Sequence, residues 1–505
     1  MKRRQLLGWS AALPLSATVT AAQAQASKDA LRIAWTQTYE NVDPYYGATR
    51  EGLIMSRHIY DTLIYADPGG GDFKPLLATA WKWVDDTTLE FTLRQGVKFH
   101  NGAPFSADDV VDTFNRVIKP DSGVKVRSIV DWIKGAEKID PYKVRVRLVK
   151  PYPAALDVLA GQLGIHNAAY FAQVGREGVI RAPIGTGPYR LKSQETDKGA
   201  VLERFDGYFA GGAKGKPSIK TIEVKVIPDA NTQMANLMTG QIDWIWRVSS
   251  DLAGKLAKVP NITVESAETM RYVALAFDAA GRAGKSPLQD TRVRQAFSYA
   301  VNRQSLRDNL IKGKSRVLNS PCFPAQFGCS ENVAKYTYDP DRAKKLLAEA
   351  GFPNGFELPM LAYTGKAETE AVAADLAKVG IKVNLRFLRS PVVRKMMEDG
   401  EAQLVMLSWG SYSVNDVSAA ISMYFDGGAY DMTRDNQVRD WIKVADNSVD
   451  KEVRKRNYQL ALDRIAKEAF WLPLTTTVTN YAHAKSLRFR APPDEVPTFF
   501  DCAWT

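Results

Sequence analysis

The clearest sequence patterns for strands, a turn and a helix lie in residues 80–117, AWKWVDDTTLEFTLRQGVKFHNGAPFSADDVVDTFNRV. In this stretch Leu89, Phe91 and Leu93 alternate with polar residues, which is the period-2 pattern of a strand with one buried face. A glutamine-glycine pair interrupts the pattern, and Val97–Phe99 then predicts a second short strand. Two neighbouring strands are therefore expected at the start of the stretch.

The second half of the stretch predicts a turn followed by a helix. Asn101-Gly102 favours a turn because both residue types adopt positive φ at low cost. Ser106, with Asp109 three residues later, is a variant of the capping box that starts helices. The helix expected after this cap would bury one apolar face, made of Val110, Phe114 and Val117.

Similar patterns recur along the rest of the chain. Apolar residues at helical spacing predict helices over 54–64 and 231–239, the second ended by Gly240. Short apolar or alternating runs predict strands over 31–35, 144–148, 222–227 and 381–387. At 505 residues the chain is too long for one compact core, and two or three domains are expected.

The sequence of residues 80–117 closely resembles the signature segment of the bacterial extracellular solute-binding proteins of family 5. Members of this family are periplasmic receptors that pass peptides, nickel chelates and other solutes to ABC importers. The resemblance covers nearly the whole chain after its first residues. Further segments match in the family's own order: Gly185-Thr186-Gly187-Pro188-Tyr189, residues 203–208, Gln241-Ile242-Asp243, and the helices expected at 291–303 and 338–352.

The resemblance implies an α/β fold of the two-lobed periplasmic binding protein type (class II-like, large cluster C), with an extra subdomain inserted in the first lobe. Crossings of the chain near Met270 and Val478 would join the lobes and act as the hinge. The expected divisions are an export signal at 1–26, lobe I at 27–270 plus 478–505, an inserted subdomain at about 50–180, and lobe II at 271–477.

The first residues have the features of an export signal. Basic residues at 2–4 precede an apolar run at 6–19, and Ala24-Gln25-Ala26 offers a small-x-small cleavage site. The adjacent arginines also resemble a twin-arginine signal, so the general secretory and twin-arginine routes both stay open. No cysteine stands at the cleavage site, and no later run of about 18 apolar residues occurs. We therefore expect a soluble periplasmic protein without a lipid anchor.

Charge and motifs argue against several other classes of protein. The net charge of +11 is spread along the chain, whereas nucleic-acid binding needs basic residues gathered on one element. Gly313-Lys314-Ser315 is not a phosphate-binding loop, because Asp308 stands where that loop needs a glycine. No HExxH or GxSxG motif follows the export signal, and the four histidines are scattered. We therefore expect no catalysis, no metal site and no cofactor.

The three cysteines suit an oxidising compartment. Cys322 and Cys329 lie seven residues apart in a loop rich in proline and glycine, and we expect them to form a disulfide bond. A metal-binding pair is the alternative. Cys502 is left over, and we expect it to be a buried free thiol.

The strongest candidates for contact with a solute follow the apolar run 404–407. Trp409 matches the tryptophan of the family's Trp-Gly binding loop, and we expect it to stack on the solute together with Tyr412. In the family's peptide receptors, an aspartate at the position of Tyr412 binds the α-amine of the peptide. Asp416 could replace that aspartate only if the loop shifts. We therefore expect binding that does not depend on a free α-amine.

Five further candidates stand near other strand ends. Tyr39, Glu40 and Asn41 follow the first strand, which is a crevice position in the family. Trp246 closes the short segment that begins with Gln241, and Tyr272 lies just past the first crossing. Aromatic residues at strand ends of α/β lobes can line a ligand crevice, with core packing as their alternative role.

The sequence as a whole predicts the periplasmic receptor of an ABC importer. We expect a monomer that closes about a hinge on its solute and then docks on a permease complex in the inner membrane. The solute would be a short or modified peptide, an opine, a sugar or a metal chelate. Two other classes stay open: a partner that presents its ligand to a membrane sensor, and an exported hydrolase, for which the chain lacks a nucleophile and a base.

Overall fold

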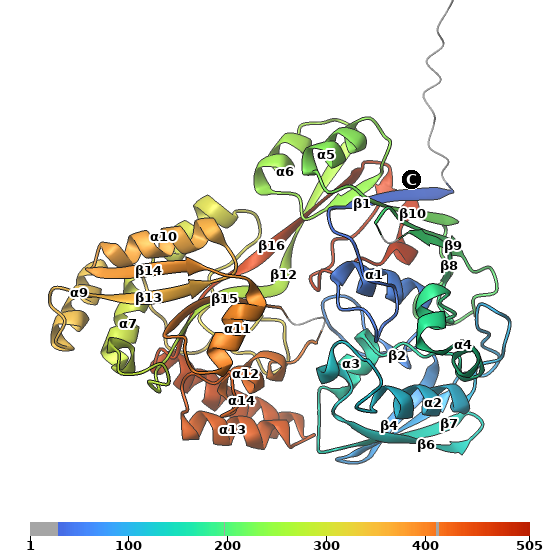
Figure 1. The fold of residues 1–505 in the computed structure, drawn as a ribbon, viewed down its shortest axis with the longest axis horizontal. Coiled ribbons are helices and arrows are strands. Elements are labelled where there is room, and N and C mark those ends of the chain that lie inside the picture. The colour runs from blue at the N-terminus through green and yellow to red at the C-terminus, as the bar shows by residue number, and fades with distance from the viewer. Residues whose placement is uncertain (1–28, 196, 411–413) are drawn as a thin grey trace, which may run out of the picture.

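The computed structural model describes residues 29–195, 197–410 and 414–505. Figure 1 shows two halves joined by two long strands, β12 (Ile262–Phe277) and β16 (Trp471–Ala484). The expected export signal lies outside the described residues. Within them, no helix is long and apolar enough to cross a membrane.

A single ten-stranded sheet passes through both halves, with β12 and β16 at its centre. Its strand order is β14-β13-β15-β12-β16-β11-β1-β10-β9-β8. In each half the outer strands include parallel pairs, whereas β12 and β16 run antiparallel to each other. The other strands of this sheet are β1 (Ala30–Trp35), β8 (Tyr189–Glu195), β9 (Gly199–Arg204), β10 (Thr221–Val226), β11 (Trp244–Trp246), β13 (Phe356–Ala362), β14 (Ile381–Phe387) and β15 (Leu404–Gly410).

The pairing of β12 with β16 is interrupted between the two halves. Glu268 pairs with Val478 and Tyr272 pairs with Thr476, so the register shifts across the three residues between Glu268 and Tyr272. Such an irregularity bends a strand and increases its local twist. The shift includes Met270 and begins at the pair containing Val478, the two positions near which the hinge crossings are expected.

The stretch quoted first forms a strand and a helix of a smaller unit in the first half. β5 (Thr88–Leu93) buries each apolar residue of its alternating pattern, which confirms the predicted strand. The predicted capping box is also confirmed at the start of α2 (Ala107–Val117). The backbone N–H of Asp108 donates to Ser106 Oγ, and the N–H of Ser106 donates to Asp109 Oδ2. β5 lies in a four-stranded antiparallel sheet with β4 (Ala78–Asp85), β6 (Ile133–Asp140) and β7 (Lys143–Leu148).

The second strand predicted in that stretch, over 97–99, is wrong. The structure has a single bridge there, between Lys98 and Pro104. Gly102 has φ +84°, which confirms the predicted turn. Because this turn reverses the chain immediately, there is no room for a longer ladder.

The other elements lie close to their predicted positions, with one exception. The helix predicted over 54–64 is α1 (Arg50–Ile59), because Ile64–Tyr65 instead form β2 and pair with β3 (Lys74–Pro75). The remaining helices are α3 (Ala155–Gly161), α4 (Ala168–Arg181), α5 (Ala230–Met238), α6 (Ser250–Leu256), α7 (Thr291–Ala300), α8 (Arg303–Ser305), α9 (Pro340–Glu349), α10 (Lys366–Ala377), α11 (Ser390–Glu398), α12 (Ser418–Phe425), α13 (Asn436–Asp446) and α14 (Lys451–Lys467). Two short strands near the C-terminus, β17 (Leu487–Arg488) and β18 (Ala503–Trp504), pair with each other.

Each half has its own apolar cores. In the first half, one core surrounds β1 and α1, and a second lies between α2 and the four-stranded sheet. In the second half, separate cores cover the two faces of the strands from β12 to β15. The two halves also touch, because Val414 and Ala419 of the second half pack against the core between α2 and the four-stranded sheet.

Candidate ligand-binding site

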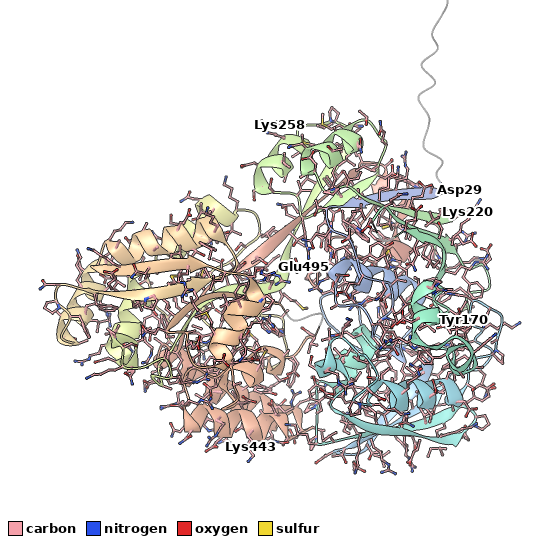
Figure 2. The ribbon with its side chains drawn as sticks, viewed as in Figure 1. Asp29, Tyr170, Lys220, Lys258, Lys443 and Glu495 are labelled. Atoms are coloured by element: carbon pink, nitrogen blue, oxygen red, sulfur yellow. A yellow bond between two sulfur atoms is a disulfide. The ribbon has the colours of Figure 1, made fainter. Side chains whose placement is uncertain are left out.

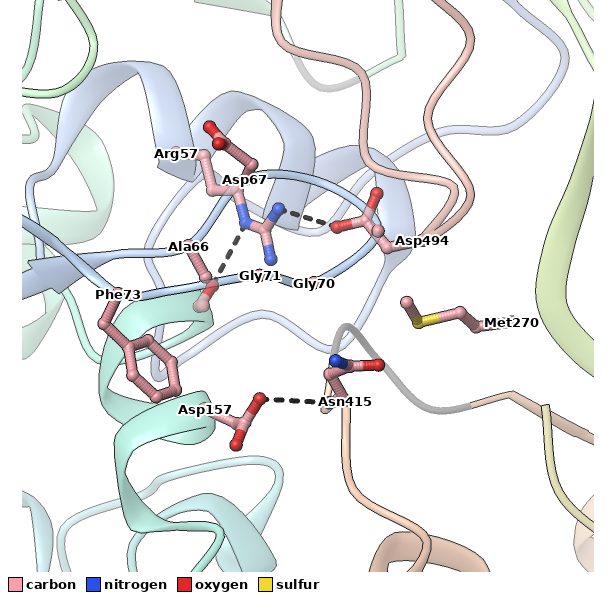
Figure 3. Close-up of a pocket in the computed structure, with 12 residues that line it drawn as sticks. Arg57, Ala66, Asp67, Gly70, Gly71, Phe73, Asp157, Met270, Asn415 and Asp494 are labelled. Carbon is pink, nitrogen blue, oxygen red and sulfur yellow. Dashed lines mark hydrogen bonds and ion pairs between the residues drawn. The ribbon is translucent and has the colours of Figure 1, made fainter. Parts of the chain in front are cut away.

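A small pocket lies where the two halves meet, close to the register shift in β12 (Figure 3). The first half contributes most of the wall, including the Gly69–Gly71 loop, Asp157 of α3 and, beside the crossings, Met270 and Asp494. The second half contributes Asn415. The interior of about 20 Å³ has room for about one water molecule. A solute would therefore fit only after the two halves move apart.

Direct polar contacts close this pocket. The backbone N–H of Asn415 donates to Asp157 Oδ1 at 3.1 Å, which joins the second half to the first. Arg57 Nη1 lies 3.0 Å from Asp494 Oδ2, and Arg57 Nε donates to the carbonyl oxygen of Gly161. Burial, followed by the charge of Asp416, raises the pKa of Asp157 to about 7. The carboxyl group of Asp157 is therefore poised between its two protonation states at neutral pH.

Trp409 and Tyr272 lie together on the neighbouring strands β15 and β12, and neither lines the pocket. Tyr272 pairs with Trp409 in the β12–β15 ladder, and their ring centroids are 5.8 Å apart. The Tyr272 hydroxyl donates to the carbonyl oxygen of Pro321 at 2.7 Å, and its side chain is fully buried. Trp409 is 7% exposed, so most of its surface packs in the core of the second half. Tyr412, the other expected stacking residue, lies outside the described residues.

Asp416 already has a cationic partner. Arg454 of α14 donates to Asp416 Oδ2 at 2.6 Å, and both side chains are almost fully buried. The other carboxylate oxygen accepts from the backbone N–H and the hydroxyl of Ser418. Since a buried carboxylate needs this compensation, Asp416 is not available to bind a ligand ammonium group without breaking the pair.

The disulfide bond between Cys322 and Cys329 closes a loop that supports this segment. The N–H of Phe327 donates to the carbonyl oxygen of Asn415, and the N–H of Val417 donates to that of Phe327. Gln326 adds hydrogen bonds from its side-chain amide to backbone carbonyls of the same segment. The loop therefore holds residues 414–417 in place beside the pocket.

Comparison with known proteins identifies the kind of binding protein that this architecture represents. Residues 72–431 match the family model of the bacterial extracellular solute-binding proteins, family 5 (middle region). The chain belongs to this family. The resemblance predicted from the sequence is thereby confirmed, and the chain is a solute receptor of the kind that serves ABC importers.

Relatives of this family 5 protein extend over nearly the entire chain. The glutathione-binding protein GsiB of Salmonella paratyphi A is 27% identical over 98% of both chains. Heme-binding protein A of Haemophilus influenzae is 28% identical over 84% of this chain and 82% of its own. The structure of NikA from Brucella suis in complex with Fe(III)-EDTA has a TM-score of 0.82, with 26% identity, and covers 94% of this chain and 100% of its own. NikA and other solved structures of similar proteins confirm the predicted two-lobed α/β fold.

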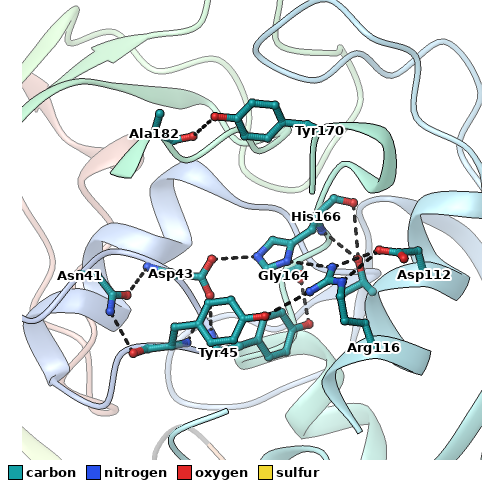
Figure 4. A network of polar contacts seen from close by, with 11 residues as sticks. Asn41, Asp43, Tyr45, Asp112, Arg116, Gly164, His166, Tyr170 and Ala182 are labelled. Carbon is teal, nitrogen blue, oxygen red and sulfur yellow. Dashed lines mark hydrogen bonds and ion pairs between the residues drawn. The ribbon is translucent and has the colours of Figure 1, made fainter. Parts of the chain in front are cut away.

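The three candidates after the first strand of the receptor are not among the residues that line the pocket. The hydroxyl of Tyr39 donates to the carbonyl oxygen of Gly199, and the side chain of Tyr39 is buried. Asn41 donates to the carbonyl oxygen of Tyr46 and accepts from the N–H of Asp43 (Figure 4). Glu40 is exposed. Tyr39 and Asn41 therefore fix the shape of this loop.

The same loop is tied to the smaller unit through a buried histidine (Figure 4). Arg116 donates to His166 Nδ1 at 3.2 Å. Since arginine has no acceptor, Nδ1 must be unprotonated, and Nε2 carries the proton that it donates to Asp43 Oδ2 at 2.9 Å. This network positions the loop after β1 against α2.

Trp246 packs against other aromatic residues in the first half. Its ring stacks 6.3 Å from that of Trp244, and both tryptophans are buried. The guanidinium group of Arg247 lies 4.1 Å from the Trp246 ring centroid. One face of the Trp246 ring therefore lies against the guanidinium group of Arg247.

Sequence reasoning did not find the charged residues of the pocket. Arg57, Asp157 and Asp494 come from three distant segments, and none belongs to a recognisable motif. It also missed Arg454, which neutralises Asp416. A buried acidic residue in a predicted binding loop implies a cationic partner, but the sequence cannot show whether that partner is the ligand or the protein.

Proposed function

We propose that the chain is the periplasmic receptor of an ABC importer, binding a small polar solute between its two lobes and delivering it to a membrane permease. The observation that carries this proposal is the pocket between two separately packed halves, beside the irregular part of the two strands that join them. Closure of such halves excludes water and strengthens polar contacts with the solute.

We propose the same division into lobes that the sequence predicts. Lobe I comprises residues 27–270 and 478–505, with an inserted subdomain at about 50–180, and lobe II comprises 271–477. In support, the core around β1 includes residues from both ends of the chain, while the cores of the second half draw on residues from 272 to 474. The core between α2 and the four-stranded sheet draws mainly on residues 45–179.

The solute that we propose is peptide-like, as glutathione is for one group of relatives. We also propose that the receptor releases it chemically unchanged. The 27% identity to those relatives leaves room for another solute. The neutral Tyr412 and the pairing of Asp416 with Arg454 both disfavour recognition through an α-ammonium group.

The test begins with the receptor exported to the periplasm and purified without denaturation. Mass spectrometry of the material that it releases should identify a small solute. Small-angle scattering should then show a smaller radius of gyration with this solute than after its removal, and deletion of the gene should abolish uptake of the solute. No contraction with any fraction of a small-molecule cell extract would contradict the proposal.

A further inference from the structure

Three arginines gather around a buried glutamate beside the lobe crossings. Arg271 donates from Nε and Nη2 to Glu495 Oε2, both at 3.1 Å. Arg50 Nη2 lies 4.0 Å from the same oxygen, and the hydroxyl of Thr479 donates to Glu495 Oε1 at 2.8 Å. Burial raises the pKa of Glu495, but the charges of Arg271, Arg50 and Arg247 outweigh it and lower the pKa below its ordinary value. Glu495 is therefore ionised.

The third arginine, Arg247, contacts a second glutamate and a tryptophan ring. Its Nη1 lies 3.4 Å from Glu51 Oε1, and its guanidinium group lies over the ring of Trp246. Arg247 and Glu495 both have positive φ, 53° and 59°. Side chains other than glycine seldom adopt this conformation, and such residues concentrate at ligand-binding and catalytic sites.

The guanidinium groups of Arg247 and Arg271 lie on the exposed side of the cluster. They pair with the carboxylates of Glu51 and Glu495, respectively. The side chains of these two glutamates are 3% and 8% exposed, whereas those of Arg247 and Arg271 are 38% and 30% exposed. The carboxylates are thus buried behind the arginines, and the guanidinium groups of Arg247 and Arg271 reach solvent.

The cluster adjoins the candidate binding site, because Arg50 Nη1 donates to the carbonyl oxygen of Asp494, which lines the pocket. Met270 and Asp494, which line the pocket, directly precede Arg271 and Glu495 in the chain. A Cβ atom placed on Gly410 would lie 2.9 Å from Arg271 Cζ, so this guanidinium group lies against the backbone at the end of β15. Figure 2 shows Glu495 where the two halves of the molecule meet.

We propose that Arg271 and Arg247 form a binding site for a carboxylate group of the transported solute; this inference rests on the proposed function as a solute receptor. Guanidinium groups bind carboxylates through paired, charge-assisted hydrogen bonds. Glu495 and Glu51 are positioning residues, because they hold the two guanidinium groups in place before the solute arrives. That preorganisation reduces the entropic cost of binding.

The experiment compares acids with their uncharged derivatives. Isothermal titration calorimetry would use glutathione, alanyl-alanine, octopine and galacturonate, each beside its methyl ester or amide. At least one acid should bind, and converting its carboxylate to the ester or amide should weaken binding about 10- to 100-fold.

The variants Arg271→Gln and Arg247→Gln should weaken binding of that acid by a similar factor, while leaving the affinity for its ester unchanged. The effects of the arginine substitution and of esterifying the acid would then be non-additive, which identifies direct contact between that arginine and the carboxylate. Arg271→Lys should retain part of the affinity. The matched control is Arg316→Gln, because Arg316 forms an exposed ion pair with Glu268 of β12 and lies outside the cluster. It should bind the acid as the wild type does.

The inference fails if an ester binds as tightly as its acid, if the variants weaken acid and ester equally, or if none of the four acids binds. Scattering with cell extract separates this failure from failure of the proposed function. Contraction with extract depleted of anions by ion exchange would uphold the receptor and reject the carboxylate site. Absence of contraction with any extract would reject both.

Discussion

At the scale of the single residue, the family's Gly-Thr-Gly-Pro-Tyr turn shows why two of its positions exclude side chains. A Cβ atom on Gly185 would lie 2.0 Å from the carbonyl oxygen of Ile59, and one on Gly187 would lie 2.4 Å from that of His58. The N–H of Gly187 also donates to the carbonyl oxygen of Ile59. The glycines therefore allow this turn to lie directly against the end of α1.

We expect Gly185→Ala to lower the free energy of unfolding by about 1–3 kcal/mol or more, because the added methyl group meets backbone that cannot rotate away. Urea denaturation would measure the loss. The matched control is Gly254→Ala in α6, where a Cβ atom meets nothing within 4 Å. It should be neutral or stabilising by up to about 1 kcal/mol, as expected in a helix interior. Equal stability of the two variants would contradict this explanation.

A second change at this scale tests Trp409. Trp409→Phe keeps an aromatic ring against Tyr272 but removes part of the surface proposed to stack on the solute. We expect solute affinity to fall about 10-fold, equivalent to about 1.4 kcal/mol, with a smaller loss of folding stability. Calorimetric binding paired with thermal denaturation measures both. Unchanged affinity with a lower melting temperature would assign Trp409 to the core alone.

At the scale of the element, the disulfide loop acts on its neighbour as well as on itself. The Cys322–Cys329 bond closes a loop whose backbone pairs with the segment after β15, including a bridge between Phe327 and Asp416. Residues 414–417 thus depend on a covalently closed partner for their position.

Replacing both cysteines by serine should therefore reduce the free energy of unfolding by about 2–3 kcal/mol. It should also speed hydrogen exchange at the N–H groups of Phe327 and Val417, which bond across the contact. Amide exchange followed by mass spectrometry would measure this. Cys502→Ser is the control, since Cys502 is free, buried and distant in sequence from the loop. Faster exchange elsewhere but not at the contact would contradict the supporting role.

At the scale of the whole molecule, closure of the lobes should depend on pH through Asp157. In the closed arrangement burial, then the charge of Asp416, raises the pKa of Asp157 to about 7, opposed by the N–H of Asn415 and the charge of Arg454. In an open form Asp157 would regain water, and its pKa would return toward the ordinary value of 3.8. The closed form therefore binds the proton more tightly.

Proton binding by Asp157 therefore favours closure most strongly below about pH 4. This contribution decreases as the pH rises toward 7, and above that value closure is independent of Asp157. Small-angle scattering of the solute-free receptor between pH 5 and 8 should show a larger radius of gyration at the higher pH. Asp157→Asn should remove most of this change, because an amide can still accept from Asn415 but does not titrate. An equal slope in the variant would place the titrating group elsewhere.

Most local elements and the family could be predicted from the amino-acid pattern alone. Three features depend on interactions within a few residues and are therefore visible in the sequence: the period-2 pattern of β5, the capping box at Ser106 and the turn at Gly102. The strand predicted over 97–99 and the predicted end of the helix at residue 64 were wrong, because the turn at Gly102 leaves only one bridge and Ile64–Tyr65 form β2. Membership of family 5 followed from many such local segments in the right order.

Which charged side chains pair with each other depends on how the elements pack in space. Asp416 is paired with Arg454 because α14 packs beside the loop that contains Asp416, and Arg271 meets Glu495 because β12 passes the C-terminal segment. These partners are separated by 38 and 224 residues, and no local pattern encodes such distances. Electrostatic pairing depends on the separation and burial of atoms in space, and the order of strands in the sheet sets both.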